Sequence, residues 1–142
     1  VFEKIEKDMN CRIIVAASGK YKYPDNVFFG GREIFYSKTN QLIQHAQFVI
    51  GHASSATWQV VASAKPIILL SDPTFLKAKN VAVRLQGEFL GVEPIMSTEF
   101  DAVSLNKEFS FKRIHYEQMR EKYFCEKGVV GDACKIIARE LA

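Results

Sequence analysis

Short apolar runs alternate with helical patterns through the first half of the chain, and this alternation limits the folds open to it. The runs are CRIIVAAS (11–18), NVFFGG (26–31), QFVIG (47–51) and KPIILL (65–70), each of strand length. Continuous apolar runs are typical of parallel strands that are buried on both faces. Strands joined through helices predict right-handed crossovers. The expected fold class is therefore α/β, a Rossmann-like open parallel sheet with helices on both faces.

Two helices are expected between these runs. Ser37 can cap the first, in which Leu42 and Ile43 share one face. Ser54 or Ser55 can cap the second, which leads into the run at 65–70.

The remainder of the chain gives weaker strand signals and a helical tail. The pattern is indistinct through 75–88, and GVEPI (91–95) is a weak fifth strand candidate. C-terminal helices are expected from Ser110 to about Phe124, and over 130–141, where apolar residues line one face.

Length and composition predict one domain. With 142 residues, of which 48% are apolar, the chain can build a single buried core, and no linker or repeat divides it. We therefore expect residues 1–142 to form one unit. The chain begins with Val1 and opens in a charged helical stretch, which is expected of a fragment of a longer polypeptide.

Charge and cysteine usage narrow the partners and the compartment. The formal charge of +3 comes from scattered lysines and arginines, which predicts no nucleic-acid partner. The three cysteines have no CxxC spacing, and Cys11 is expected in a buried strand, so we predict a reducing compartment and no zinc site. No apolar run is long enough to span a membrane and no signal peptide is evident, so a cytoplasmic protein is expected.

The most informative stretch is GHASSATWQVVASAKPIILLSDPT (51–74). In parallel α/β sheets, ligands bind beyond the carboxyl ends of the strands, and here a strand passes through a turn of small residues into a helix. The free N–H groups of such a helix and its dipole favour an anion, and Ser54 and Ser55 would let a phosphate approach closely. In the alternative interpretation, these two serines only cap the helix.

This stretch resembles the donor site of B-type glycosyltransferases and of their relative UDP-N-acetylglucosamine 2-epimerase. In those enzymes a small-residue turn precedes a helix that carries Glu or Gln, and Lys-Pro and a hydrophobic strand follow. On this chain the turn falls on His52 to Ser55, the helix residue on Gln59, Lys-Pro on Lys65-Pro66, and a trailing Asp-x-Thr on Asp72 to Thr74. The resemblance covers about residues 11–75.

Two departures bear on the reaction. Gln59 stands where the family commonly has a glutamate that binds the ribose or sugar hydroxyls, and His52 stands where the epimerases have an acid. A carboxamide can bridge hydroxyls but cannot act as a base. A neutral imidazole could donate to phosphate or sugar. The two departures count against an epimerase activity more than they count against binding of the donor.

The resemblance implies the nucleotide-sugar-binding half of a two-domain glycosyltransferase of surface polysaccharide or lipopolysaccharide synthesis. The acceptor and the catalytic base would come from a missing N-terminal domain, and peripheral membrane association of the full enzyme stays open. No Asp-x-Asp occurs, so we expect no bound metal and no cofactor. The substrate-binding residues implied are Ser18, Gly19, Lys20, Gly30, Gly31, Arg32, His52, Ser54, Ser55, Gln59, Asp72 and Thr74.

Other functions stay open. An epimerase-like or glycerophosphate-transferase enzyme would share this build, and a non-catalytic module for sugar nucleotides or proteins is the alternative of another class. A hydrolase is disfavoured because the turn is not G-x-S-x-G. The G-x-G-x-x-G and P-loop motifs are absent, which disfavours NAD binding and nucleotide hydrolysis.

Overall fold

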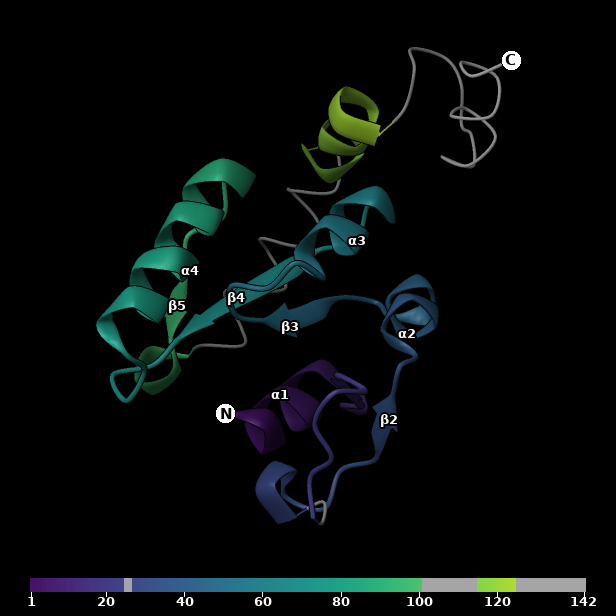
Figure 1. Cartoon of the computed structure of the whole chain (residues 1–142), viewed down its shortest axis with the longest axis vertical. Helices are drawn as coiled ribbons and strands as arrows, with labels where there is room; N and C mark the ends of the chain where they lie inside the picture. Colours follow the sequence, from purple (N-terminus) through teal and green to yellow (C-terminus); the bar gives the residue numbers. More distant parts are fainter. Residues whose placement is uncertain (25–26, 101–114, 125–142) are drawn as a thin grey trace.

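The protein is an α/β structure in which short parallel strands alternate with helices (Figure 1). The computed structural model describes residues 1–24, 27–100 and 115–124. In chain order the elements are α1 (Phe2–Met9), β1 (Val15–Ala17), the 3₁₀ turn η1 (Val27–Phe29), β2 (Ile34–Tyr36), α2 (Thr39–His45), β3 (Val49–Gly51), α3 (Thr57–Ala62), β4 (Ile67–Ser71), α4 (Lys77–Leu90), β5 (Ile95–Met96) and the 3₁₀ turn η2 (Ser97–Glu99). Residues 115–124 form a further helix.

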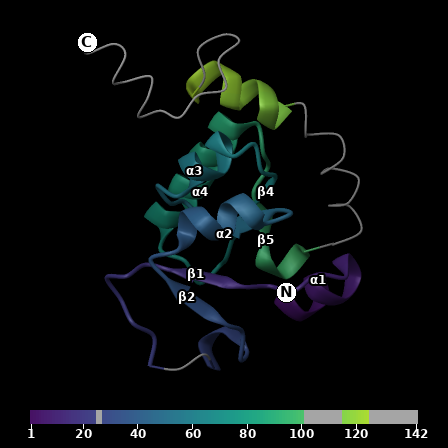
Figure 2. The same ribbon diagram turned by 90° about the vertical axis from the view of Figure 1, so that its right-hand side faces the viewer.

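The strands form two small parallel sheets. One is the pair β1–β2, and the other has the order β3–β4–β5. Val49 lies opposite Ile67 in the β3–β4 pair, and Leu70 lies opposite Ile95 in the β4–β5 pair. Figure 2 shows β1 and β2 side by side at the opposite end of the molecule from the 115–124 helix. The predicted α/β class with parallel strands is confirmed, although the sheets are short.

The core is built around β4. Ile67, Ile68 and Leu69 are buried because β4 is the central strand of the larger sheet and side chains from helices pack against it, which explains its continuous apolar run. Helices supply most of the remaining residues of the principal cluster, among them Val60, Val61, Val83, Leu90, Tyr116 and Met119. Tyr116, from the 115–124 helix, thereby joins the C-terminal part of the described chain to the sheet.

Helix α4 occupies the region in which the sequence pattern was indistinct. Its buried positions are Val83, Gly87 and Leu90, a stripe of helical spacing. Leu85 and Phe89 lie on its exposed surface. Because these two side chains are apolar, the sequence of α4 lacks a clear division into apolar and polar faces. The helix ends at Gly91, which has a φ of 63° and provides the left-handed C-cap that glycine favours.

The first two predicted strands are wrong in extent or type. The run at 11–18 contains a strand only at Val15–Ala17, because Asn10 adopts a left-handed conformation and closes α1 just before it. Cys11 is therefore half-buried beside α1 and lies outside the strand. The run at 26–31 is not a strand: it holds η1 and a turn, and β2 begins only at Ile34.

The predicted helix caps are also wrong, whereas the strands after them are confirmed. Ser37 has a φ of 56° and precedes α2, whose N-cap is Lys38. Helix α3 begins at Thr57 with Ala56 as its N-cap and has no side-chain cap hydrogen bond. β3 falls inside its predicted run, β4 begins inside its run and ends one residue past it at Ser71, and β5 overlaps the fifth strand candidate only at Ile95.

The C-terminal helices are tested only in part. Residues 115–124 are helical, as expected, and the predicted helix over 130–141 lies outside the described residues. In the part of the chain that the structure describes, no helix has both the length and the apolar character needed to cross a membrane.

Candidate functional site

The loops that follow β3, β4 and β5 converge at one edge of the larger sheet. Because these strands are parallel, their carboxyl ends lie at the same edge. The His52 ring, after β3, lies 5.9 Å from the Phe75 ring, after β4. The Ser97 hydroxyl, after β5, donates a hydrogen bond to the Asp72 carboxylate. These contacts bring His52, Asp72 and Thr74 together at one edge.

Ser54 is held by hydrogen bonds within its own turn and to α4. Its Oγ accepts from the Ala56 N–H at 3.2 Å, and its carbonyl accepts from the Thr57 N–H at 3.1 Å. The Gln86 amide closes the turn from α4: Oε1 accepts from the Ser54 N–H at 3.3 Å, and Nε2 donates to the Ser54 carbonyl at 3.1 Å. Several donors predicted to hold a phosphate are therefore already used.

Ser55 is the exposed position of this turn. Its carbonyl accepts from the Trp58 N–H at 3.3 Å, whereas its own N–H meets no acceptor among the described residues. The donors that remain for an anion at this turn therefore include the Ser55 N–H and the hydroxyl groups of Ser54 and Ser55, with the exposed His52 beside them.

Asp72 organises the loop after β4. Its carboxylate accepts from the Thr74 N–H at 2.9 Å and from the Thr74 hydroxyl at 2.5 Å, in addition to Ser97. These bonds, that of the Ser97 hydroxyl first, hold the pKa of Asp72 below its usual value. The Asn80 amide then ties the start of α4 to this loop through Ser71 and the Asp72 carbonyl. The hydrogen-bonding groups of Asp72 and Thr74 that were predicted to bind a substrate are therefore used within the loop.

Ser18, Gly19 and Lys20 lie at the carboxyl edge of the smaller sheet. The Ser18 Oγ accepts from the Lys20 N–H at 3.2 Å. A Cβ at Gly19 would collide with the Ser37 hydroxyl at the end of β2, so glycine allows this close approach. Within the described residues, no hydrogen bond or ring contact joins these three to the His52, Ser54 or Asp72 loops.

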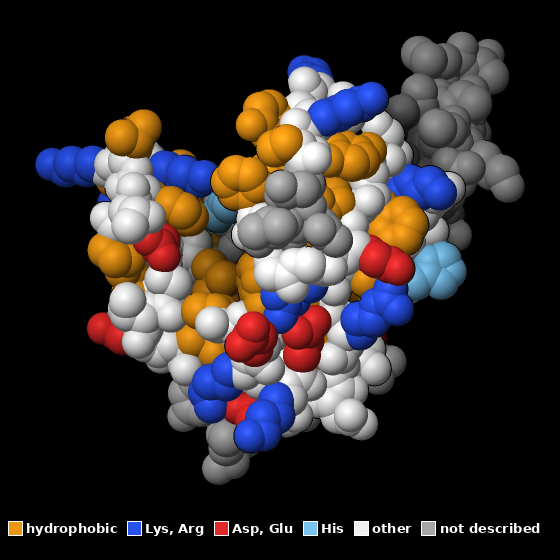
Figure 3. Space-filling view, turned by 90° about the horizontal axis from the view of Figure 1, so that it is seen from below, with side chains coloured by type: hydrophobic (Ala, Val, Ile, Leu, Met, Phe, Trp, Pro, Cys, Tyr) orange, Lys and Arg blue, Asp and Glu red, His pale blue; other side chains and the backbone are white. Residues whose placement is uncertain are grey.

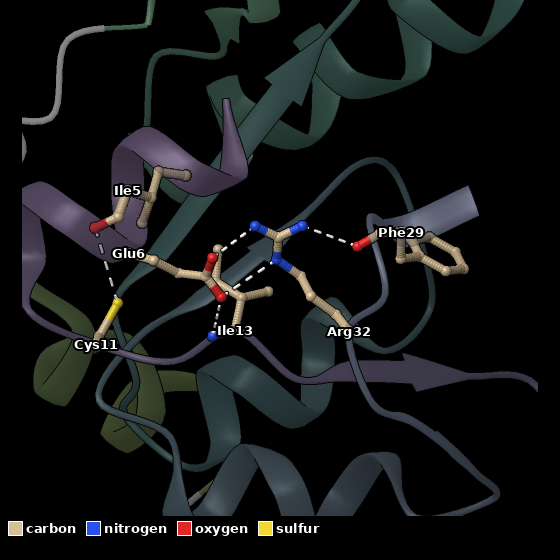
Figure 4. A network of polar contacts seen from close by, with 6 residues as sticks. All are labelled: Ile5, Glu6, Cys11, Ile13, Phe29 and Arg32. Carbon is tan, nitrogen blue, oxygen red and sulfur yellow. Dashed lines mark hydrogen bonds and ion pairs between the residues drawn. The ribbon is translucent and has the colours of Figure 1, made fainter. Parts of the chain in front are cut away.

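Gly30, Gly31 and Arg32 lie at the opposite edge, so their predicted position after a strand is wrong. They precede β2, and the next residue, Glu33, pairs through its carbonyl with the first residue of β1. The Arg32 guanidinium binds the Glu6 carboxylate of α1, with Nη2 to Oε2 at 2.5 Å, and donates to the Phe29 carbonyl at 2.8 Å (Figure 4). Consecutive positive φ angles at the two glycines turn the chain back into the sheet.

Gln59 is exposed on α3, whereas Gln86 contacts the turn. Sequence reasoning missed Gln86 because the pattern did not reveal α4. Its position three residues after Val83 places a polar side chain next to the buried stripe of a helix, and that signal could have identified it.

An open groove of about 890 Å³ begins at the carboxyl edge of β4 and β5 and continues along α4. Ser71, Phe75 and Met96 line its start. Lys77 and Arg84 place cationic groups along it, but Arg84 is ion-paired with Glu88, and Glu93 is a further acid of the lining. The Lys79 ammonium group lies 4.4 Å from the centroid of the Phe75 ring, and the His52 ring also contacts this ring. The groove therefore combines an aromatic ring, hydrophobic surface and charged groups of both signs.

In the described ranges, no cluster of three or more histidine, cysteine or acidic side chains could hold a metal ion. Comparison with protein-family models gives no match, and comparison with curated proteins gives none either.

Proposed function

We propose that this domain binds a nucleoside-diphosphate sugar at the carboxyl edge of β3–β5 and forms the donor half of a two-domain glycosyltransferase. The observation that carries the proposal is that the loops after β3 and β4 meet at the start of the groove along α4, where the His52 ring lies 5.9 Å from the Phe75 ring that lines the groove. A groove whose exposed lining is mainly apolar suits a small-molecule ligand. The resemblance of residues 51–74 to the donor-site pattern supports the same location.

Each part of the ligand has a matching part of the groove. The Ser55 N–H and hydroxyl, in the turn after β3, and the His52 imidazole offer donors to phosphate oxygens, and Lys77 at the start of the groove offsets part of the diphosphate charge. The hydrophobic surface near Phe75 and Met96 would accept the base or the sugar.

The proposed chemistry is stabilisation of the leaving group. When the glycosidic C–O bond breaks, negative charge develops on the departing diphosphate oxygen. Hydrogen-bond donors and cations fixed beside that oxygen lower the barrier. The acceptor and the catalytic base would come from a second domain, in an enzyme of surface-polysaccharide or lipopolysaccharide synthesis that works in the cytoplasm.

The central test places a negative charge in the turn. In Ser54→Asp, the carboxylate can still accept from the Ala56 N–H, so the fold should be kept while the charge repels a diphosphate. We expect UDP, CDP or GDP, whichever binds the wild type, to bind at least about tenfold more weakly, since a loss of roughly 1.4 kcal/mol gives that factor. Calorimetry and melting temperature measure the two effects.

Asn40→Asp is the matched control, because it adds the same charge to the exposed first turn of α2, outside the groove. It should bind nucleotides as the wild type does. Equal nucleotide affinity for the wild type and Ser54→Asp, with unchanged melting temperatures, would mean that the phosphate does not lie at this turn.

Two further results are expected from the 142-residue chain alone. Nucleotide binding should persist in a chelator, because the donors proposed are N–H and O–H groups and cationic side chains. Sugar transfer should not occur, because the second wall of the cleft is missing. Transfer by this chain alone, or loss of binding in EDTA, would count against the proposal.

A further inference from the structure

A cluster of aromatic side chains lies in the connection between β1 and β2, and we call it the aromatic loop (residues 20–24 and 27–29). Two of its rings are strongly exposed: Tyr21 is 62% exposed and Phe28 is 71% exposed. The loop lies at the end of the molecule that is lowest in Figure 1. Seen from that end, hydrophobic side chains gather together with lysine or arginine side chains (Figure 3).

The exposed rings are supported from beneath. The Tyr21 and Phe28 rings contact the Tyr23 ring, with centroids 5.0 and 6.2 Å away. Tyr23 in turn packs against Phe29 at 4.9 Å, and its N–H donates to the Tyr36 hydroxyl of β2 at 3.0 Å.

Arg32 completes this support. It donates to the Phe29 carbonyl while it is bound to Glu6, so the loop is tied to both β2 and α1. A surface that is held in this way loses little conformational entropy on binding.

The charges around the exposed rings are mainly positive. Lys20 and Lys22 flank Tyr21 and are exposed, and the Lys38 ammonium group lies over the Phe35 ring of the neighbouring strand. Asp25 is the single acid in the sequence from 18 to 32. The nearby acids Glu6 and Glu33 are neutralised by Arg32 and Arg12.

We propose that the aromatic loop docks the domain on an anionic lipid surface. Tyrosine and phenylalanine rings favour the boundary between head groups and acyl chains, because one part of that boundary is apolar and the other is wet. Lysines beside such rings reach the anionic head groups with their long side chains. No residue of the loop lines the groove along α4, so docking leaves the nucleotide groove accessible.

Vesicle sedimentation with the full chain tests this docking. The wild type should sediment with vesicles of equal parts phosphatidylserine and phosphatidylcholine, and not with phosphatidylcholine alone. Binding should fall in about 1 M salt, where charges are screened beyond roughly 3 Å. The double variant Tyr21→Ser, Phe28→Ser should bind at least about tenfold more weakly, and Lys22→Ala about fivefold more weakly.

Two controls and one conservative variant make the result specific. Leu76→Ser removes a large apolar side chain that is 81% exposed elsewhere, and Lys122→Ala removes an exposed lysine of the 115–124 helix. Both should bind as the wild type does. Phe28→Trp should bind at least as tightly as the wild type, a result that damage to the fold could not give.

Several outcomes would overturn the docking. They are equal sedimentation with neutral and anionic vesicles, an equal loss in the Leu76→Ser control, no sedimentation of the wild type, or binding to a nucleic acid or an acidic polysaccharide in place of vesicles. Because the nucleotide test above uses no membrane, either proposal can fail while the other stands.

Discussion

Glu6 and Arg32 form an ion pair between residues that are 26 positions apart in the sequence. Their side chains are 26% and 11% exposed, so water screens the pair only in part. The hydrogen bonds from Arg32, followed by that from the Ile13 N–H, hold the pKa of Glu6 below the ordinary 4.5. By contrast, burial raises the pKa of the neighbouring Cys11 thiol, and the Glu6 charge adds to this effect. A raised pKa keeps the thiol protonated and weakly nucleophilic.

The ion pair predicts a specific dependence of stability on pH. Since the folded-state pKa of Glu6 is lowered, its contribution is present above about 4.5 and is lost as the pH falls through the folded-state pKa. Glu6→Gln should lower the free energy of unfolding by about 1–2 kcal/mol at neutral pH and should flatten this acid-dependent loss. Urea unfolding at a series of pH values measures both.

Glu33→Gln is the matched control for Glu6→Gln. Glu33 pairs with Arg12, but the two side chains are 57% and 66% exposed. An exposed pair is worth less than about 1 kcal/mol, so this variant should change stability little. A loss in Glu33→Gln as large as that in Glu6→Gln would show that burial does not decide the strength of these pairs.

At the scale of elements, α4 packs on β4 and turns directly into the segment before β5. The tightest point is Gly87, whose missing side chain makes room for the Val92 carbonyl and Pro94. A Cβ there would lie 2.5 Å from the Val92 oxygen and 2.9 Å from Pro94. This glycine thus serves close packing, because it lies inside a helix, where glycine otherwise costs stability.

Gly87→Ala should therefore destabilise the fold even though alanine is the better helix former. We expect a loss of about 1–3 kcal/mol from overpacking against backbone that cannot move freely. Gly51→Ala is the control, since no atom lies within 4 Å of a Cβ at that position. Thermal and urea unfolding compare the two, and a Gly87→Ala variant as stable as the wild type would show that the α4–β5 turn yields easily.

For the whole molecule, the 115–124 helix joins the chain's later part to the sheet. β5 pairs only with Leu70 and Ser71, so Ile67, earlier in β4, has no strand partner on that edge. The Tyr116 hydroxyl takes the place of the missing strand: it accepts from the Ile67 N–H at 3.3 Å and lies 3.4 Å from the Ile67 carbonyl. Tyr116 is 1% exposed, so water cannot replace it.

Tyr116→Phe should consequently cost about 1–3 kcal/mol, because it leaves a buried backbone N–H without a partner. Tyr123→Phe removes a hydroxyl from the same helix at a side chain that is 44% exposed, and it should be nearly neutral. Hydrogen exchange at the Ile67 amide provides a local measurement. Unchanged protection at Ile67 in Tyr116→Phe would contradict the role assigned to the hydroxyl.

The α/β class, β3 and β4, and the helical character of 115–124 could all be predicted from the sequence. These follow from local periodicity and from the continuous apolar run of a strand that is buried on both faces. The sequence also singled out the stretch 51–74, whose loops converge because parallel strands share a carboxyl edge.

The polar groups that remain available at that edge depend on contacts between distant parts of the chain. Gln86 uses the Ser54 N–H from a helix 32 residues away, and Asp72 is bound by Thr74 and Ser97. Arg32 is bound to Glu6 at the opposite edge because Gly30 and Gly31 turn the chain before β2 begins. Contacts between residues far apart in sequence leave no local period, so the residue pattern could indicate candidates but could not assign their partners.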